Sequence, residues 1–123
     1  MKTGLDICTT LAECLTHDGE RVEVVGVYTV ADVFPSQKRD SELPRPVQLM
    51  LDGEPGPFLE PYWHAQAVRS PEEMARYRGK RVRVRGTFRR RQPPNPDPRA
   101  ASMGGACLCS IEEIVLAQQD ALP

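Results

Sequence analysis

Two kinds of side chain in this sequence have the chemistry to bind a nucleic-acid strand: cations for its phosphates and aromatic rings for its bases. The candidate ligand-binding residues are Lys38, Arg39, Arg45, Tyr62, Trp63, Arg89, Arg90, Arg91 and Arg99. Cationic side chains neutralise phosphates, and aromatic side chains stack on unpaired bases. These residues predict a site for single-stranded DNA or RNA, provided that the fold brings them together.

Other residues of the same segments favour an ordinary protein surface. Asp40, Glu42 and Asp97 lie among the cations and would lower the positive potential. Phe58 and Trp63 have a second interpretation, in which they fill a hydrophobic core. The net charge is −1, whereas nucleic-acid domains are commonly basic. Strong, non-specific binding of nucleic acid is therefore not expected.

The charge is divided unevenly along the chain. Residues 1–60 hold 5 Lys and Arg against 11 Asp and Glu, and residues 61–123 hold 11 against 6. Oppositely charged surfaces can meet a partner or a second copy of the same chain. The alternative prediction is therefore a protein–protein interaction adaptor or an oligomerising structural module.

Cysteine and histidine side chains suggest a different chemistry, the binding of a structural zinc ion. The candidate metal ligands are Cys8, Cys14, His17, Cys107 and Cys109. The spacings C-x5-C and C-x-C differ from the C-x2-C of common zinc sites, and buried free cysteine is frequent. Zinc is thus a secondary hypothesis, and the main prediction includes neither a metal nor another cofactor.

Motifs that would indicate catalysis do not occur in the sequence. It contains no Gly-rich phosphate loop and no HExxH motif, and His17 and His64 have no nucleophile signature beside them. We therefore predict a binding protein and not an enzyme.

Length and composition predict a single globular domain over residues 1–123. The chain is 40% apolar and 27% charged, as in ordinary soluble proteins. Residues 1–15 contain no apolar run that would suit a signal peptide or a membrane span. We expect a cytoplasmic protein without a membrane partner, whose cysteines form no disulfide framework.

A repeated segment provides the clearest structural signal. GERVEVVGVY at 19–28 and GKRVRVRGTF at 79–88 share Gly, Arg, Val, Val and Gly, followed by an aromatic residue. Valine alternates with polar residues in both copies, which predicts two half-buried strands. Gly26 and Gly86 lie inside these strands and predict a bulge or a sharp bend.

Hydrophobic patterns and turn residues predict the remaining elements. Strands are expected at 21–34, 47–51, 58–63, 81–90 and 111–117. Helices are expected at 5–15, with a capping box at Thr10 and Glu13, and at 71–78, with Ser70 as N-cap and Glu73 closing the box. The Pro-rich segments 35–46 and 92–106 are expected to be loops.

This order of elements resembles the OB-fold, the oligonucleotide/oligosaccharide-binding barrel. The paired GxRVxVxGx(aromatic) strands and the segment SPEEMARYRGKRVRVRG carry the resemblance, over about residues 19–117. It implies a mainly β, five-stranded barrel, preceded by an N-terminal helical segment at 1–18, with a helix between strands three and four and a tail at 118–123. It also implies a binding face on strands two and three, flanked by the 35–46 and 92–106 loops, but no activity.

The three alternating arginines of the second repeat have a structural interpretation. Strands one and four of this fold pair antiparallel, so Arg81, Arg83 and Arg85 are expected opposite Glu20 and Glu23. Such cross-strand pairs contribute roughly 0.2 to 1 kcal/mol each. The cations beyond the strand therefore remain the better ligand candidates.

Overall fold

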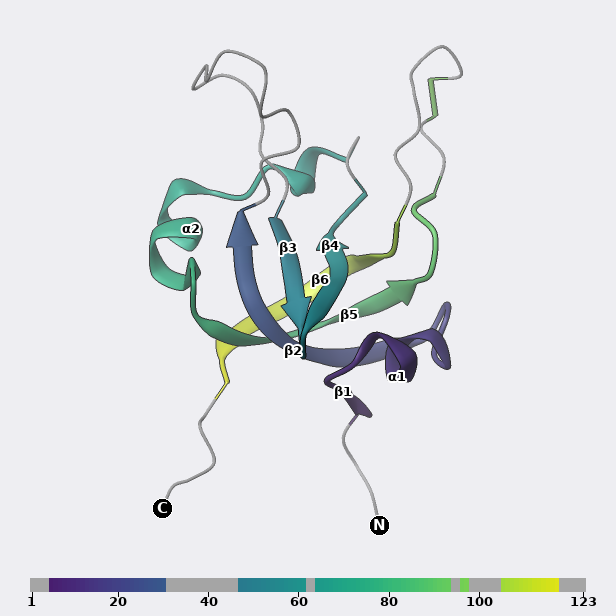
Figure 1. Ribbon diagram of the computed structural model, residues 1–123. Coiled ribbons are helices and arrows are strands. Elements are labelled where there is room, and N and C mark those ends of the chain that lie inside the picture. Colours follow the sequence, from purple (N-terminus) through teal and green to yellow (C-terminus); the bar gives the residue numbers. More distant parts are fainter. Residues whose placement is uncertain (1–4, 31–46, 62–63, 94–95, 98–104, 118–123) are drawn as a thin grey trace, which may run out of the picture.

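A computed structural model describes residues 5–30, 47–61, 64–93, 96–97 and 105–117, most of which belong to one curled six-stranded sheet (Figure 1). The elements in chain order are β1 (Ile7–Cys8), α1 (Leu11–Leu15), β2 (Arg21–Val30), β3 (Val47–Leu51), β4 (Glu54–Leu59), the 3-10 turn η1 (Ala65–Ala67), α2 (Pro71–Tyr77), β5 (Arg81–Arg89) and β6 (Cys107–Leu116). The expected mainly β fold is confirmed.

Five of the strands close into a ring. The pairing order is β2–β3–β4–β6–β5, and β5 pairs back to β2. Only β4 and β6 run parallel within this ring, and the short β1 adds to β2 outside it. Closure depends on β2, which pairs with β5 over 21–27 and bends to pair with β3 over 27–30 (Figure 1).

The two sequence repeats form one antiparallel pair with approximate two-fold symmetry. Val24 lies opposite Val84, and these are equivalent positions of the two copies. The flanking pairs exchange partners about this point: Val22 with Gly86, Gly26 with Val82, Gly19 with Phe88, and Gly79 with Tyr28. The repeat therefore encodes the seam between β2 and β5.

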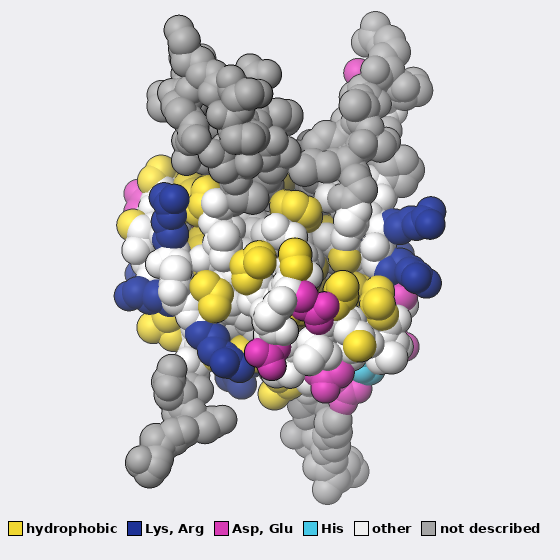
Figure 2. All heavy atoms as spheres, in the orientation of Figure 1, with side chains coloured by type: hydrophobic (Ala, Val, Ile, Leu, Met, Phe, Trp, Pro, Cys, Tyr) yellow, Lys and Arg dark blue, Asp and Glu magenta, His cyan; other side chains and the backbone are white. Residues whose placement is uncertain are grey.

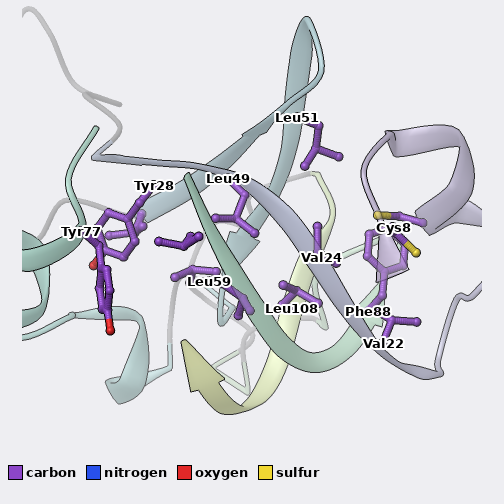
Figure 3. Packing of buried hydrophobic residues seen from close by; sticks show 14 residues of the cluster. Cys8, Val22, Val24, Tyr28, Leu49, Leu51, Leu59, Tyr77, Phe88 and Leu108 are labelled. Carbon is purple, nitrogen blue, oxygen red and sulfur yellow. The ribbon is translucent and has the colours of Figure 1, made fainter. Parts of the chain in front are cut away.

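The core fills the inside of the ring. Tyr28 and Phe88, the aromatic residues that end the two repeats, lie at opposite ends of the core and are fully buried (Figure 3). Val24, Leu49 and Leu108 lie between them. The alternation in β2 and β5 directs every second residue into this space, so the polar residues between them face outward.

Gly26 and Gly86 are required by close backbone contacts. A Cβ atom on Gly26 would lie 2.8 Å from the carbonyl oxygen of Met50, and one on Gly86 would lie 2.9 Å from that of Cys109. The β5–β6 register shifts at Gly86, as expected for a bulge, whereas β2 and β5 stay in regular register through Gly26. At Gly26 the constraint is thus the bend of β2 over β3.

Two strand boundaries differ from the sequence-based prediction. The third strand, expected at 58–63, is β4 at Glu54–Leu59, because Gly53, with φ of 78°, completes a tight turn directly after β3. Two prolines in β4 lack an N–H group, and the β3–β4 register becomes irregular after Gln48, whose amide donates a 2.9 Å bond to the Gly56 carbonyl. That side-chain bond supports a strand that prolines would otherwise weaken.

The fifth strand, expected at 111–117, is β6 at Cys107–Leu116. Leu108 occupies the core with no exposed surface, so the strand begins before the apolar run that marked it. Ser110 has a left-handed φ of 52°, which breaks the alternation there and conceals the continuity of the strand in the sequence.

The N-terminal helix is also shorter than expected. Ile7 pairs in parallel with Glu23 of β2, and α1 begins only at Leu11. The capping box of Thr10 and Glu13 is present at this start. Within the described residues, no helix is long and apolar enough to cross a membrane.

The substitution Gly26→Ala should destabilise the fold. The added methyl group would meet the backbone of β3, so one of the two strands would have to shift, and overpacking of this kind costs about 1 to 3 kcal/mol. Urea denaturation should show a lower midpoint with an unchanged slope. The control is Val27→Ala at the neighbouring exposed position, which should change the midpoint by less than half as much; equal effects would contradict the close contact.

Candidate functional site

The structure describes three of the nine predicted ligand residues. Arg89 ends β5, and Arg90 and Arg91 follow it; all three are exposed. The other six candidates lie outside the described residues: Lys38, Arg39, Arg45, Tyr62, Trp63 and Arg99.

Arg89 belongs to a row of paired residues that crosses five strands on the outside of the ring. The row runs Thr29, Gln48, Phe58, Cys107 and Arg89, from β2 through β3, β4 and β6 to β5. Paired residues direct their side chains to the same side of a sheet, and the core residues alternate with them. Phe58 and Arg89 are two strand spacings apart, or about 10 Å. We call these five residues the outer row.

The surface around this part of the ring has a distinct distribution of side chains. Figure 2 shows hydrophobic side chains gathered at the centre of the face that carries β3 and β4, with Lys and Arg on both flanks. Most Asp and Glu side chains in this view lie toward α1 and β1, and some adjoin the lower edge of the hydrophobic centre. An apolar centre with cationic margins is the arrangement that base stacking with phosphate contact requires.

A cavity of about 460 Å³ opens beside the outer row, between the end of β4, η1 and β6. Its lining includes the polar residues Glu60, His64, Gln66, Arg69, Arg89, Cys109 and Ser110. Arg89 is therefore shared by the outer row and the cavity.

Glu60 is a residue of this cavity that the sequence analysis missed. It is only 5% exposed and has a left-handed φ of 72°, which is uncommon for a residue with a side chain. Its carboxylate accepts a 3.1 Å bond from the Ile111 N–H, and its own N–H donates to the Leu108 carbonyl at 2.7 Å. The only sign in the sequence is a single charge within the apolar stretch FLEPYW.

The cysteines form two separate pairs. Cys8 and Cys14 are core residues beside α1, whereas Cys107 and Cys109 point to the outer side of β6, with their sulfur atoms 3.4 Å apart. No group of three or more His, Cys, Asp or Glu in the described part of the chain could hold a metal ion. His17 instead bonds to Glu20 at 2.7 Å. The zinc hypothesis placed the start of the last strand beside the first helix. In the structure the sheet lies between the two cysteine pairs, so they cannot share a metal ion.

The two pairs differ in their acidity. Burial raises the pKa of Cys8 and raises the pKa of Cys14 to about 12. The hydrogen bond with Cys107 lowers the pKa of Cys109, against the effect of burial and with support from Arg89, and the same bond raises the pKa of Cys107. Cys109 is therefore the most acidic thiol of the four.

A cluster of polar side chains holds α2 to β2 at the far side of the cavity. Arg69 donates two bonds to Glu73, at 2.7 and 2.8 Å, and Tyr28 donates a third at 2.6 Å. Glu73 was expected to close the cap at Ser70; Ser70 does accept a bond from the Glu73 N–H, but the Glu73 carboxylate is engaged by Arg69 and Tyr28. Burial alone would raise the pKa of Glu73, but these bonds outweigh it and leave the pKa below its usual 4.5.

The expected Arg–Glu ladder is confirmed for Glu23 and wrong for Glu20. Arg85 contacts Glu23 at 3.2 Å and Glu113 of β6 at 2.8 Å, and Arg83 lies 3.7 Å from Glu23. Glu20 precedes β2 and bonds to His17. Arg83 and Arg85 of the second repeat are thus matched by acidic groups, and the cations after Phe88 remain the ligand candidates.

Comparisons of the chain with protein-family models, curated proteins and solved structures found no match. A function for this chain therefore rests on the geometry of its own residues.

The substitution Glu73→Gln should destabilise the protein by about 1 to 3 kcal/mol at neutral pH, because it leaves the largely buried Arg69 without its anionic partner. Since the folded pKa of Glu73 is depressed, its contribution is complete above pH 4.5 and is lost as the pH falls through the folded value. Urea denaturation from pH 7 to pH 3 should show the difference from wild type shrinking at the acid end. The control Glu72→Gln, at an exposed position of the same turn, should have little effect at any pH; a difference that grows on acidification would contradict the assignment.

Proposed function

We propose that this chain is an OB-like barrel that binds single-stranded nucleic acid on the outer face of β3 and β4. The order of the ring supports the proposal, because the last strand inserts between the third and fourth ring strands, as in a Greek-key barrel. In such barrels the ligand lies across the second and third strands of the ring, here β3 and β4.

The observation that carries the proposal is the presence of Phe58 and Arg89 in one outward row. Phe58 is half-buried, so its ring is held in place by the sheet while part of its surface is accessible. Arg89 is exposed at the margin of the same row and is followed by two further arginines. A base stacked on Phe58 would place its neighbouring phosphate toward these cations.

The segments that connect the ring strands in the sequence contain the other predicted ligand residues. The segment from β2 to β3 contains Lys38, Arg39 and Arg45, and the segment from β5 to β6 contains Arg99. Tyr62 and Trp63 come shortly after β4 in the sequence, beyond Glu60 and Pro61. In our proposal these residues extend the site formed by Phe58 and Arg89–Arg91.

The proposed ligand is single-stranded because stacking on Phe58 needs an unpaired base. The contribution of each phosphate contact falls with salt, as counterions compete for the strand. In this proposal the protein binds the nucleic-acid strand and does not catalyse a reaction on it. The alternative, a protein–protein interaction adaptor, requires no oligonucleotide binding. A binding titration with an oligonucleotide therefore distinguishes the two proposals.

Charge reversal at Arg89, Arg90 and Arg91 should weaken binding of a short oligonucleotide by at least about tenfold at low salt, because three phosphate contacts are replaced by repulsion. Fluorescence anisotropy with labelled oligo-dT and oligo-U, at two salt concentrations, measures both the affinity and its salt dependence. The slope against salt should become shallower in the variant.

The matched control reverses Arg76, Arg78 and Lys80, which are exposed near the opposite end of β5 and give the same change of net charge. This control should lose about threefold or less. Equal losses of affinity in the two variants would show that the effect comes from net charge alone and contradict the site. An absence of binding by the wild-type protein at tens of micromolar in low salt would overturn the proposal.

The substitution Phe58→Leu should reduce affinity without a comparable loss of stability. Stacking of a base on an aromatic side chain contributes roughly 1 to 3 kcal/mol, and leucine preserves much of the apolar volume. The titration should show a roughly five- to hundredfold weaker complex with little change in salt dependence. An unchanged affinity with an unchanged urea midpoint would show that no base stacks on Phe58.

A further inference from the structure

We infer that Cys107 and Cys109 form a reversible dithiol–disulfide site, which a peroxide reaches through the cavity beside β6. The inference is independent of nucleic-acid binding. It rests on the separation of the two sulfur atoms, the irregular backbone after Cys109 and the access that the cavity provides.

The two thiols are already in contact. Their sulfur atoms lie 3.4 Å apart on the outer side of β6, and a disulfide requires about 2.05 Å. Residues i and i+2 of a strand have Cα atoms about 6.6 Å apart, close to the upper limit that a disulfide spans. The bond can therefore form with a small movement, and its strain makes it easy to reduce.

The backbone beside Cys109 can supply this movement. Arg85 and Thr87 of β5 are two residues apart, but their partners on β6, Glu113 and Cys109, are four residues apart. The extra residues of β6 form a bulge at this point. Ser110 has a left-handed φ of 52° inside the bulge. Cys109 is thus the last residue before an irregular segment and is not fixed on both sides by a regular ladder.

Access and reactivity both favour Cys109 as the attacking thiol. Its half-buried side chain lines the 460 Å³ cavity, whereas Cys107 has no exposed surface. Arg89 lines the same cavity, and its positive charge helps to lower the pKa of Cys109 and so stabilises the thiolate. Cys107 lies behind it as the resolving thiol.

The oxidation proceeds in two balanced steps with hydrogen peroxide as the oxidant. The Cys109 thiolate attacks one peroxide oxygen, the O–O bond breaks, and the released hydroxide takes a proton to leave as water. The Cys107 sulfur then attacks the sulfenic acid on Cys109; the S–S bond forms, the S–O bond breaks, and the Cys107 proton leaves with the hydroxide as a second water. Two thiols lose two electrons and two protons in total, and one peroxide becomes two waters.

Cys8 and Cys14 provide an internal control. Both are core residues, 1% and 0% exposed. Neither lines the cavity beside β6, and burial raises the pKa of both. The same chemistry should therefore be much slower at this pair.

The test is a mass-spectrometric thiol assay on the full chain. Reduced protein, freed of metal with a chelator, is treated with hydrogen peroxide, quenched with N-ethylmaleimide under denaturing conditions and digested with trypsin. Cleavage after Lys2, Arg21 and Arg99 separates the pairs, because fragment 3–21 contains Cys8 and Cys14 and fragment 100–123 contains Cys107 and Cys109. We expect 100–123 to lose two hydrogen atoms and both alkylation sites while 3–21 keeps its two thiols, and reduced glutathione to reverse the change.

Single substitutions assign the roles of the two thiols. Cys107→Ser should accumulate a sulfenic acid on Cys109 that dimedone traps, and Cys109→Ser should leave Cys107 unmodified at the same peroxide dose. Arg89→Gln should slow the oxidation roughly three- to tenfold through a smaller thiolate fraction, and Arg90→Gln should not. Equal oxidation of the two fragments, two intact thiols in 100–123, or a disulfide that resists glutathione would each overturn the inference.

Discussion

The fold depends on one strand pair, in which the two copies of the repeat lie antiparallel about Val24 and Val84. Because the pair has approximate two-fold symmetry, the aromatic residue that ends each copy meets the opening glycine of the other, and Tyr28 and Phe88 come to opposite ends of the core. The remaining edge of β5 pairs with β6, and that of β2 pairs with β3 over 27–30 and with the short β1 at Glu23 and Val24. The ring closes because β2 bends at Gly26 to serve both neighbours.

This pairing also determines what the charged residues can do. Strand alternation directs the arginines of β5 outward, where Glu23 of β2 and Glu113 of β6 lie directly beside Arg85. A basic strand thereby becomes a solvated Arg–Glu ladder. Beyond Phe88 the chain leaves the seam, and in the sheet Arg89 lies opposite Cys107, with Phe58 one strand further. The cations with a functional role in our proposal thus begin where the repeat ends.

The same geometry separates chemically identical side chains. Cys14 is enclosed by the core, which disfavours its thiolate, whereas Cys109 faces the outer side of β6 beside Arg89 and a cavity. The bulge of β6 and the left-handed Glu60 build that cavity, and the bond between the Glu60 carboxylate and the Ile111 N–H joins the two irregular positions. Backbone strain at two non-glycine residues is thereby concentrated around one reactive thiol.

The sequence alone determined the mainly β class, the two repeat strands and the glycine at each bend, because alternation and close packing act locally and leave a periodic pattern. It also predicted Glu23 as an ion-pair partner. Only the tertiary structure decided that Cys107 lies inside a strand, that Glu20 turns to His17, and that Glu60 is buried. The positions of Cys107 and Glu60 depend on register between distant strands, and one bulge at Ser110 shifts that register without a signal in the local pattern; Glu20 turns to His17 because it precedes β2 and lies outside the ladder.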